Sequence, residues 1–226
     1  MPQIPASTLK FLKDLSQNNT REWFQGHKKE WESVKSNFEE TVQDLINRIG
    51  KFENLAGIRV QDCNYRIARD VRFSPDKSPY KTWLAASFGE GGRKSPKMDY
   101  YLHILPSGSF LGGGMWDANP VQLAKFRQEV DYNPQEIKAI IYAPQFKEHF
   151  GNPEGSSLKT APKGYPKDHP DIELIRRTQL FFSHSFTDKE VTSPDFTEKV
   201  EQSCLLLKPY LDFLNMIFEE SAEEEN

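Results

Sequence analysis

The chain has 226 residues, of which 37% are hydrophobic and 27% are charged, so its composition is that of a globular protein and excludes a disordered chain. The net charge is -4, which gives no global case for a partner that is nucleic acid or an acidic membrane. No apolar run is long enough to span a bilayer and residues 1–10 lack an apolar signal core, so we expect a cytoplasmic protein with no membrane partner.

The chain ends in an acidic tail. Residues 219–226 hold five of the 33 acidic residues, and the remainder of the chain is nearly neutral. We predict that this tail is the frayed end of a single domain that covers residues 1–226. The two cysteines, Cys63 and Cys204, lie far apart without a CxxC partner, which does not favour a disulfide framework.

Helical patterns open the chain. Apolar residues at helical spacing predict a helix over residues 7–15. Asn19 followed by Glu22 resembles a capping box, which predicts that the next helix begins there. Gly50 ends that helix, and its apolar stripe is expected to face the core. The residues of this stripe are Trp31, Val34, Phe38, Val42, Leu45 and Ile49.

Strand patterns replace helical ones in the middle of the chain. Residues 82–88, 99–105 and 109–116 read as strands, and Pro106-Ser107-Gly108 is a tight turn signal between the last two. A further strand is expected around Tyr65. Because no helix separates these runs and parallel pairing needs long crossovers, we predict an antiparallel meander.

Helices dominate the remainder. Asn119-Pro120 and Asn133-Pro134 each predict a helix start. Beyond them we expect a loop over 152–169, a short helix over 170–177, a strand over 179–186, a capping box at Thr187 to Glu190, and a final helix opened by Ser193-Pro194 that Pro209 kinks or divides. The fold class predicted is α+β, with a mainly antiparallel sheet and helices packed against it in a single domain.

The segment 66–81 is the most informative part of the chain. It concentrates cations and is stiffened by two prolines, so most of it cannot be a helix interior. Arginine forks and lysine ammonium groups match phosphate or carboxylate oxygens, which favours an anion site. The alternative is a surface of salt bridges to Asp70 and Asp76. The candidate ligand-binding residues here are Arg66, Arg69, Arg72, Lys77, Tyr80 and Lys81.

A histidine and a tyrosine share one face of the second expected strand. Strand alternation places Tyr101 and His103 side by side, where His103 can act as a general acid or base. The alternative is a half-buried, hydrogen-bonded histidine without a catalytic role. Both interpretations remain open at this point.

Two further segments carry candidate residues. Three consecutive glycines, 112–114, leave strand faces bare for a ligand or for close packing, and Trp116 after them is a stacking candidate. Lys163 belongs to a second cationic loop, which also contains Asp168 and His169. Either of these two can act with a residue from elsewhere, or His169 can simply open the next helix.

These motifs resemble one family. They are the run from Arg66 to Lys81, the run from Gly112 to Trp116, Pro162-Lys163-Gly164-Tyr165 with Asp168-His169-Pro170, and the N-terminal Phe11-Leu12, Asn18-Asn19 and Arg21-Glu22-Trp23-Phe24. The pattern is similar to that of an uncharacterised, mainly bacterial family, domain of unknown function 2461, over about residues 9–218. The resemblance implies a single domain and brings no established activity.

The leading hypothesis is binding of, or enzymatic action on, a phosphorylated or otherwise anionic small molecule in a cationic cleft. Whether the chain is an enzyme stays open. The candidate catalytic residues are His103, His169 and Asp168, and Tyr101, Trp116 and Lys163 join the six residues of segment 66–81 as ligand-binding candidates. The hypothesis requires the basic segment and the Lys163 loop to meet. No metal site is predicted, and the cofactor and oligomeric state stay unknown.

Two alternatives stand beside this hypothesis. In the first, the basic loops dock a protein or a nucleic acid without catalysis, although the acidic balance does not favour nucleic acid. In the second, the arginines are structural and form buried pairs with Asp62, Asp70 or Asp99.

Overall fold

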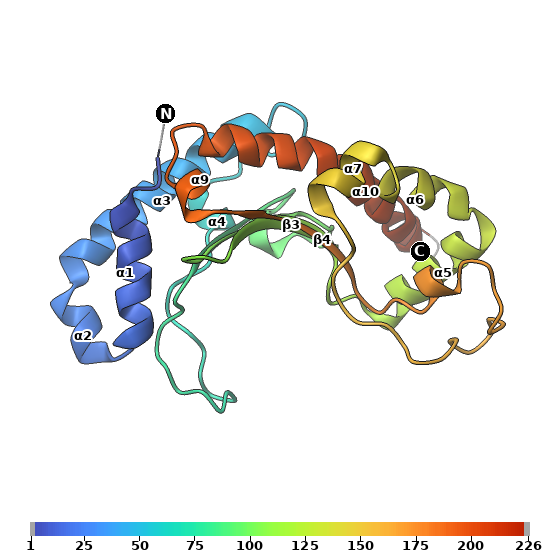
Figure 1. Ribbon diagram of the computed structural model, residues 1–226, viewed down its shortest axis with the longest axis horizontal. Helices are drawn as coiled ribbons and strands as arrows, with labels where there is room; N and C mark the ends of the chain where they lie inside the picture. Colours follow the sequence, from blue (N-terminus) through green and yellow to red (C-terminus); the bar gives the residue numbers. More distant parts are fainter. Residues whose placement is uncertain (1–2, 224–226) are drawn as a thin grey trace. The chain divides into compact units, whose positions relative to one another are not determined.

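The structure, a computed structural model, describes residues 3–223. Within them the chain forms α1 (Ala6–Gln17), α2 (Arg21–Gly26), α3 (Lys28–Ile49), α4 (Val60–Cys63), β1 (Leu84–Phe88), the 3-10 helix η1 (Gly92–Lys94), β2 (Tyr100–Ile104), β3 (Ser109–Met115), α5 (Pro120–Tyr132), α6 (Pro134–Ile141), α7 (Pro144–Phe150), α8 (Ile172–Ile175), β4 (Leu180–Phe186), α9 (Asp188–Val191) and α10 (Phe196–Glu223) (Figure 1). This architecture confirms the predicted α+β class.

The four strands form one antiparallel sheet in the order β1-β2-β3-β4. The first pair runs in register from Leu84 opposite Ile104 to Phe88 opposite Tyr100. The expected meander is therefore confirmed for β1, β2 and β3, and β4 joins it after a long helical excursion. The alternation of strand side chains then places Tyr101 and His103 on one face and Leu102 on the other, as the sequence predicts.

The described chain divides into two compact units. The first comprises residues 1–96, 100–111 and 185–202, and the second comprises 97–99, 112–184 and 203–226. Strands β3 and β4 and helix α10 each pass from one unit into the other. The single domain over the whole chain stays a prediction, and each unit is described by itself below.

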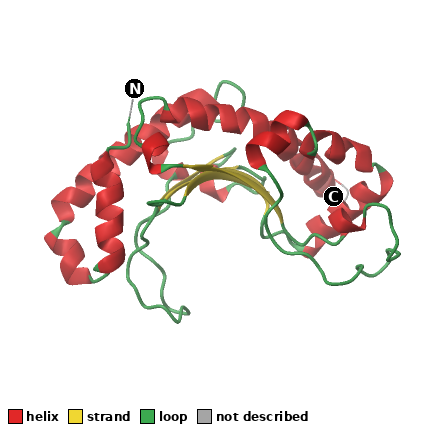
Figure 2. Ribbon diagram, in the orientation of Figure 1, coloured by secondary structure: helices red, strands yellow, loops and turns green. Residues whose placement is uncertain are grey.

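In the first unit, α3 supplies the core. Its buried stripe agrees with the expected one, except that Trp31 is only half-buried. The apolar faces of β1 and β2 carry Leu84, Leu102 and Ile104, which are almost fully buried. Figure 2 shows helices on one side of these strands and loops on the other. The sheet therefore has one face that is packed against helices.

The helix predicted to begin at Asn19 is two helices. The side-chain cap of α2 is Thr20, whose Oγ1 accepts from the Trp23 N–H at 3.2 Å. The chain then breaks at His27, and α3 begins at Lys28. The capping prediction was therefore wrong by one residue, because the Asn19 side chain is engaged by a distant segment, as described below.

Residues 66–81 form a hairpin-like loop, which we call the basic hairpin. Its base is closed by hydrogen bonds from the Arg69 N–H to the Pro79 carbonyl (2.9 Å) and from the Lys81 N–H to the Ile67 carbonyl (2.8 Å). The strand expected around Tyr65 is reduced to isolated bridges at Asn64 and Ala68. The basic hairpin is the teal loop below the strands in Figure 1.

In the second unit, the glycine run is a packing device. A Cβ on Gly112 would lie 2.6 Å from the Phe181 ring, and one on Gly114 would lie 2.8 Å from the Tyr210 ring. The Tyr210 hydroxyl donates to the Leu180 carbonyl at 2.6 Å, so this fully buried tyrosine fastens α10 to the start of β4. The space that the glycines leave is thus filled by protein side chains.

The remaining elements agree with the sequence in part. Helices follow both Asn-Pro pairs, and Thr187 caps α9 with Glu190 in the expected box. Helix α10 runs through Pro209 without being divided. Helices α4 and α7 and η1 were not anticipated. Of the acidic tail, α10 extends to Glu223, and the prediction for residues 224–226 lies outside the described residues.

Candidate functional site

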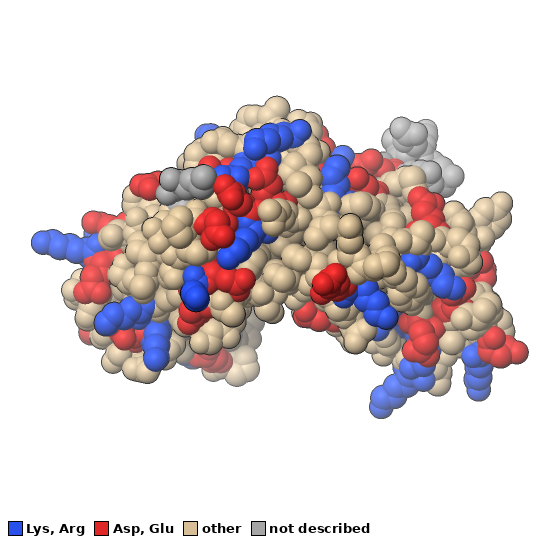
Figure 3. Space-filling view, turned by 45° about the horizontal axis from the view of Figure 1, so that its top comes forward, with Lys and Arg blue, Asp and Glu red and all other residues tan. Residues whose placement is uncertain are grey.

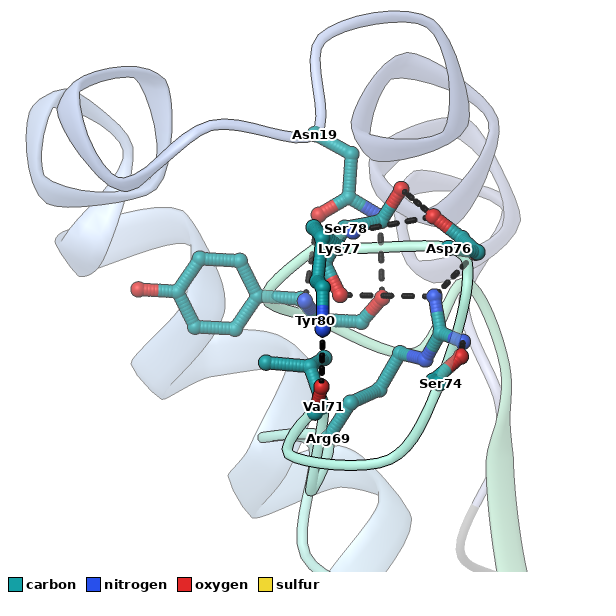
Figure 4. Close-up of polar contacts among 8 residues, drawn as sticks. All are labelled: Asn19, Arg69, Val71, Ser74, Asp76, Lys77, Ser78 and Tyr80. Carbon is teal, nitrogen blue, oxygen red and sulfur yellow. Dashed lines mark hydrogen bonds and ion pairs between the residues drawn. The ribbon is translucent and has the colours of Figure 1, made fainter.

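Arg69 organises the interior of the basic hairpin. Its guanidinium forms an ion pair with Asp76 and donates to the Ser78 carbonyl (3.3 Å) and the Ser74 hydroxyl (3.4 Å) (Figure 4). The Ser78 hydroxyl and N–H donate to Asp76 at 2.7 and 2.9 Å. These Ser78 bonds, together with Arg69, hold the pKa of Asp76 well below its usual range. Arg69 therefore shapes the loop.

The tip of the basic hairpin is also internally bonded. Arg72 pairs with Asp70 at 2.7 Å and lowers the pKa of that carboxyl, with a smaller contribution from the charge of Arg66. The Lys77 ammonium donates to the Val71 carbonyl at 2.9 Å. Three of the expected anion-binding cations thus have partners within the loop. Arg69 and Arg72 pair with Asp76 and Asp70, as the salt-bridge alternative predicts, whereas Lys77 bonds to a backbone carbonyl. Asp62 instead pairs with Arg59 at 2.9 Å, outside the hairpin.

The hairpin is anchored on the helices by Asn19 and Tyr80. Asn19 Nδ2 donates to the Tyr80 carbonyl at 2.9 Å, and Asn19 Oδ1 accepts from the Tyr80 N–H at 3.1 Å. The Tyr80 ring stacks on Phe24 with centroids 4.0 Å apart. Tyr80 therefore holds the returning strand of the hairpin in place (Figure 4).

A cavity of about 710 Å³ lies at the base of the basic hairpin. Arg66 and Lys81 line it, and among the described residues neither has a hydrogen-bonded carboxylate. The acid in the lining, Glu39, is paired with Lys35 at 3.6 Å. The lining residues are Trp31, Lys35, Phe38, Glu39, Gln61, Asn64, Tyr65, Arg66, Ile67, Lys81, Leu84, Arg93 and Lys94. The cavity is therefore rich in positive charge.

Lys81 has an unusual environment for a lysine. Its ammonium lies 4.5 Å from the Trp83 ring centroid and 5.4 Å from that of Tyr65. Partial burial lowers the pKa of Lys81, and the charge of Arg66 lowers it further. The aromatic faces favour the charged form and oppose this shift. Two neighbouring cations thus share one cavity without a neutralising carboxylate bonded to either.

Two further cations reach this cavity from η1. Arg93 donates to the Gln61 carbonyl (2.5 Å) and the Asn64 carbonyl (2.9 Å), which fixes η1 against α4. A Cβ on Gly92 would lie 2.5 Å from the Asp62 carbonyl oxygen, and the φ of Gly92 is +62°, so only glycine fits. Lys94 follows on the exposed side of the lining. Arg93 and Lys94 were not predicted as site residues. The pair of glycines before Arg93 is the sequence feature that could have indicated this tight turn.

A smaller cavity, of about 550 Å³, lies beside the hairpin interior. It is lined by Ser16, Asn19, Arg69, Asp70, Asp76, Ser78, Tyr80, Lys81, Thr82 and Trp83. Lys81 lines both cavities and so forms part of the wall that they share. The smaller cavity contains carboxylates as well as cations, so its net charge is lower.

Tyr101 and His103 lie in an aromatic cluster on the face of β2 opposite Leu102. The Tyr101 hydroxyl lies 3.1 Å from His103 Nδ1, and the His103 ring stacks on Phe110 and contacts Trp83. Burial lowers the pKa of His103 to about 4, while burial and then Tyr65 raise the pKa of Tyr101 to about 12. Near neutral pH the Tyr101 hydroxyl is therefore hydrogen-bonded to a neutral imidazole, which is a weak base. A catalytic role for His103 stays a prediction.

The other candidate residues belong to the second unit. His169 is bonded at both nitrogens, to Asp131 at 2.9 Å and to the Asp171 N–H at 3.0 Å. Asp168 and Lys163 are exposed. Trp116 is 52% exposed and makes an edge contact with Phe181. The requirement that the Lys163 loop meets the basic hairpin stays a prediction.

One protein-family model matches most of the chain. The family model of a conserved hypothetical protein, DUF2461, matches residues 7–213. The chain belongs to the DUF2461 family. No curated protein and no solved structure matches it.

The DUF2461 match spans the basic hairpin, both cavities and the candidate residues of the second unit, and it assigns no chemistry to any of them. Among residues 3–223 there is no group of three or more histidine, cysteine or acidic side chains that could hold a metal ion. No helix in the same residues is long and apolar enough to cross a membrane.

Proposed function

We propose that this DUF2461 protein binds a phosphorylated or otherwise anionic small molecule in the larger cavity. The observation that carries the proposal is the pair Arg66 and Lys81, which line one cavity without a bonded carboxylate in the described residues. Burial and then the charge of Arg66 lower the pKa of Lys81, and a bound anion would offset the repulsion from Arg66. A volume of about 710 Å³ is in the usual range for small-molecule sites.

Each cation has a distinct part in this proposal. Arg66 offers a planar fork for two oxygens of the anion, and Lys81 adds a point charge in the same cavity. Lys94 contributes at the exposed rim. Arg69, Arg72 and Lys77 act on the loop, since their donors are bonded within it.

Thermal unfolding tests the proposal. The parent, Arg66→Ala and Arg72→Ala should be compared in inorganic phosphate and in sodium chloride at the same ionic strength, and then against phosphorylated metabolites and nucleotides. Arg72 is the matched control because it belongs to the same hairpin, is paired with Asp70 and does not line the cavity.

We expect phosphate to raise the Tm of the parent and of Arg72→Ala and to leave Arg66→Ala unchanged. Saturation to 100 times Kd stabilises a native state by about 2.7 kcal/mol, which is readily measured. An equal rise of Tm in all three proteins would place the anion elsewhere and overturn the proposal.

A second candidate function is docking of a partner by the basic hairpin. It is favoured by Phe73, which is 94% exposed at the tip beside Arg72. On the face shown in Figure 3, lysine and arginine side chains are interspersed with acidic ones, so that face offers no continuous basic stripe for nucleic acid. Salt-dependent binding of a labelled single-stranded oligonucleotide that Phe73→Ala abolishes would support docking over small-molecule binding.

A further inference from the structure

The amine of Lys81 differs from the other cations of the larger cavity in three ways. It lies against two aromatic rings, Trp83 and Tyr65, which limit its hydration. Lys81 also lines the second, smaller cavity. The charge that acts on its amine is that of another cation, Arg66, and no hydrogen bond holds its Nζ among the described residues.

Partial burial beside a second cation is what activates a lysine as a nucleophile, and it acts against the two aromatic rings, which favour the charged form. A lysine amine attacks carbonyl carbons only in its neutral form, and a hydrophobic surrounding or an adjacent cation increases the neutral fraction. The same two causes, burial and then Arg66, lower the pKa of Lys81. Lys94 lines the same cavity but is exposed.

Other charged or titratable side chains also border the two cavities around Lys81. They are Lys35 and Glu39 from α3, Tyr65 and Arg66 from the segment after α4, Arg93 and Lys94 from η1, and Arg69, Asp70, Asp76 and Tyr80 from the basic hairpin. The carboxylates among them are already bonded to Lys35, Arg72, Arg69 and Ser78. None of them forms an ion pair with the Lys81 amine among the described residues.

We propose that Lys81 forms an imine with an aldehyde or ketone whose phosphate or carboxylate group is held by Arg66. This inference rests on the proposed function and names its ligand class. The lysine nitrogen attacks the carbonyl carbon, and a C–N bond forms while the carbonyl electron pair moves to oxygen. The nitrogen gives up its two protons and the oxygen leaves as water, so one amine and one carbonyl yield one imine and one water.

Reductive trapping tests this inference in the full chain. The protein is treated with pyridoxal 5′-phosphate, which carries an aldehyde and a phosphate, and with pyridoxal, which lacks the phosphate. A hydride reagent then reduces any imine to a stable secondary amine, and peptide mass spectrometry ranks the modified lysines. Lys94 in the same cavity and Lys13 on the exposed side of α1 are the internal references.

We expect pyridoxal 5′-phosphate to modify Lys81 at least tenfold faster than Lys94 or Lys13. In Arg66→Ala, the ratio of the Lys81 rate to the rates of the reference lysines should fall to the ratio seen with pyridoxal. Lys81→Arg keeps the charge but should yield no adduct in the peptide that contains residue 81. Equal modification of Lys81 and Lys94 by both aldehydes would overturn the inference.

A second measurement separates this inference from the proposed function. Reductive methylation with formaldehyde requires no anion site, and its pH profile reports the basicity of each amine. The rate at Lys81 should reach half its maximum at a lower pH than the rate at Lys94. If phosphate stabilises the parent but Lys81 reacts like Lys94, the binding site stands and the nucleophile is refuted. If Lys81 reacts early but phosphate has no effect on Tm, the anionic ligand is refuted together with the proposed function.

Discussion

Asn19 binds both backbone groups of Tyr80, with its Nδ2 donating to the carbonyl at 2.9 Å and its Oδ1 accepting from the N–H at 3.1 Å. The two residues are 61 positions apart, so this pair ties the turn between α1 and α2 to the basic hairpin. Lys81 is the next residue along the chain. The position of the proposed nucleophile therefore depends on the side-chain amide of Asn19, in the connection between α1 and α2.

Replacing Asn19 by alanine should loosen the hairpin. Two partly buried hydrogen bonds are lost, and we expect the free energy of unfolding to fall by about 1–2 kcal/mol. The cleavage rate by trypsin within residues 66–81 should rise. Asn18→Ala is the control, because among the described residues the Asn18 side chain bonds only to the Asp14 carbonyl in α1. Unchanged protection of the hairpin in Asn19→Ala would contradict the anchoring role.

Gly92→Ala should distort the larger cavity. The new Cβ would lie 2.5 Å from the Asp62 carbonyl oxygen, which requires η1 to move and carries Arg93 and Lys94 with it. Gly57→Ala is the matched control, since Gly57 has a similar φ of +77° and no heavy atom within 4 Å of its Cβ position. We expect Gly92→Ala to lose about 1–3 kcal/mol more stability than Gly57→Ala in urea unfolding. Equal losses would show that backbone strain alone decides both.

His103 should make stability depend on pH. Its pKa is lowered to about 4 in the folded protein, below the ordinary value of 6.5, so the folded state disfavours the proton. The contribution of His103 to the free energy of unfolding is complete above pH 6.5 and is lost as the pH falls from 6.5 to 4. His149, with a pKa of about 4 from burial and His184, adds a loss in the same range.

His103→Gln keeps a hydrogen-bonding partner for Tyr101 and removes the titration. Urea unfolding at pH 7 and pH 4.5 should show a smaller loss of stability in the variant, by about 1–2 kcal/mol once the partial exposure of the ring is considered. Identical pH profiles for the two proteins would show that the ring is hydrated in both states.

Tyr210→Phe should destabilise the second unit. The hydroxyl that donates to the Leu180 carbonyl is fully buried, so its removal leaves that carbonyl without this donor and should cost about 1–2 kcal/mol. Tyr132→Phe removes a hydroxyl from a side chain that is 89% exposed and should leave the Tm unchanged. Equal Tm values for both variants would contradict the role of Tyr210.

The elements that the sequence predicted well are those set by local pattern. The α3 stripe and the three meander strands follow from spacings of three to four and of two residues. The cap at Asn19 was misassigned because its partner, Tyr80, is remote in sequence. Helix α4 and η1 are too short to show a period, and they are held by Arg93 and by the close approach at Gly92.

The candidate site could be predicted only in outline. The concentration of cations in segment 66–81 indicated positive charge, but not which side chains would be available to a ligand. Arg69 and Arg72 have the same chemistry as Arg66, and only the folded loop brings carboxylates to the first two. Lys94 was not predicted because the segment that lines the larger cavity with it, residues 61–67, lies about 30 positions earlier in the chain.

Because Lys81 lines both cavities, a ligand that moves its side chain in one cavity would change the other. If both cavities bind a ligand, thermodynamic reciprocity requires each ligand to alter the binding constant of the other by the same factor. One shared residue would thus couple two ligands that never touch.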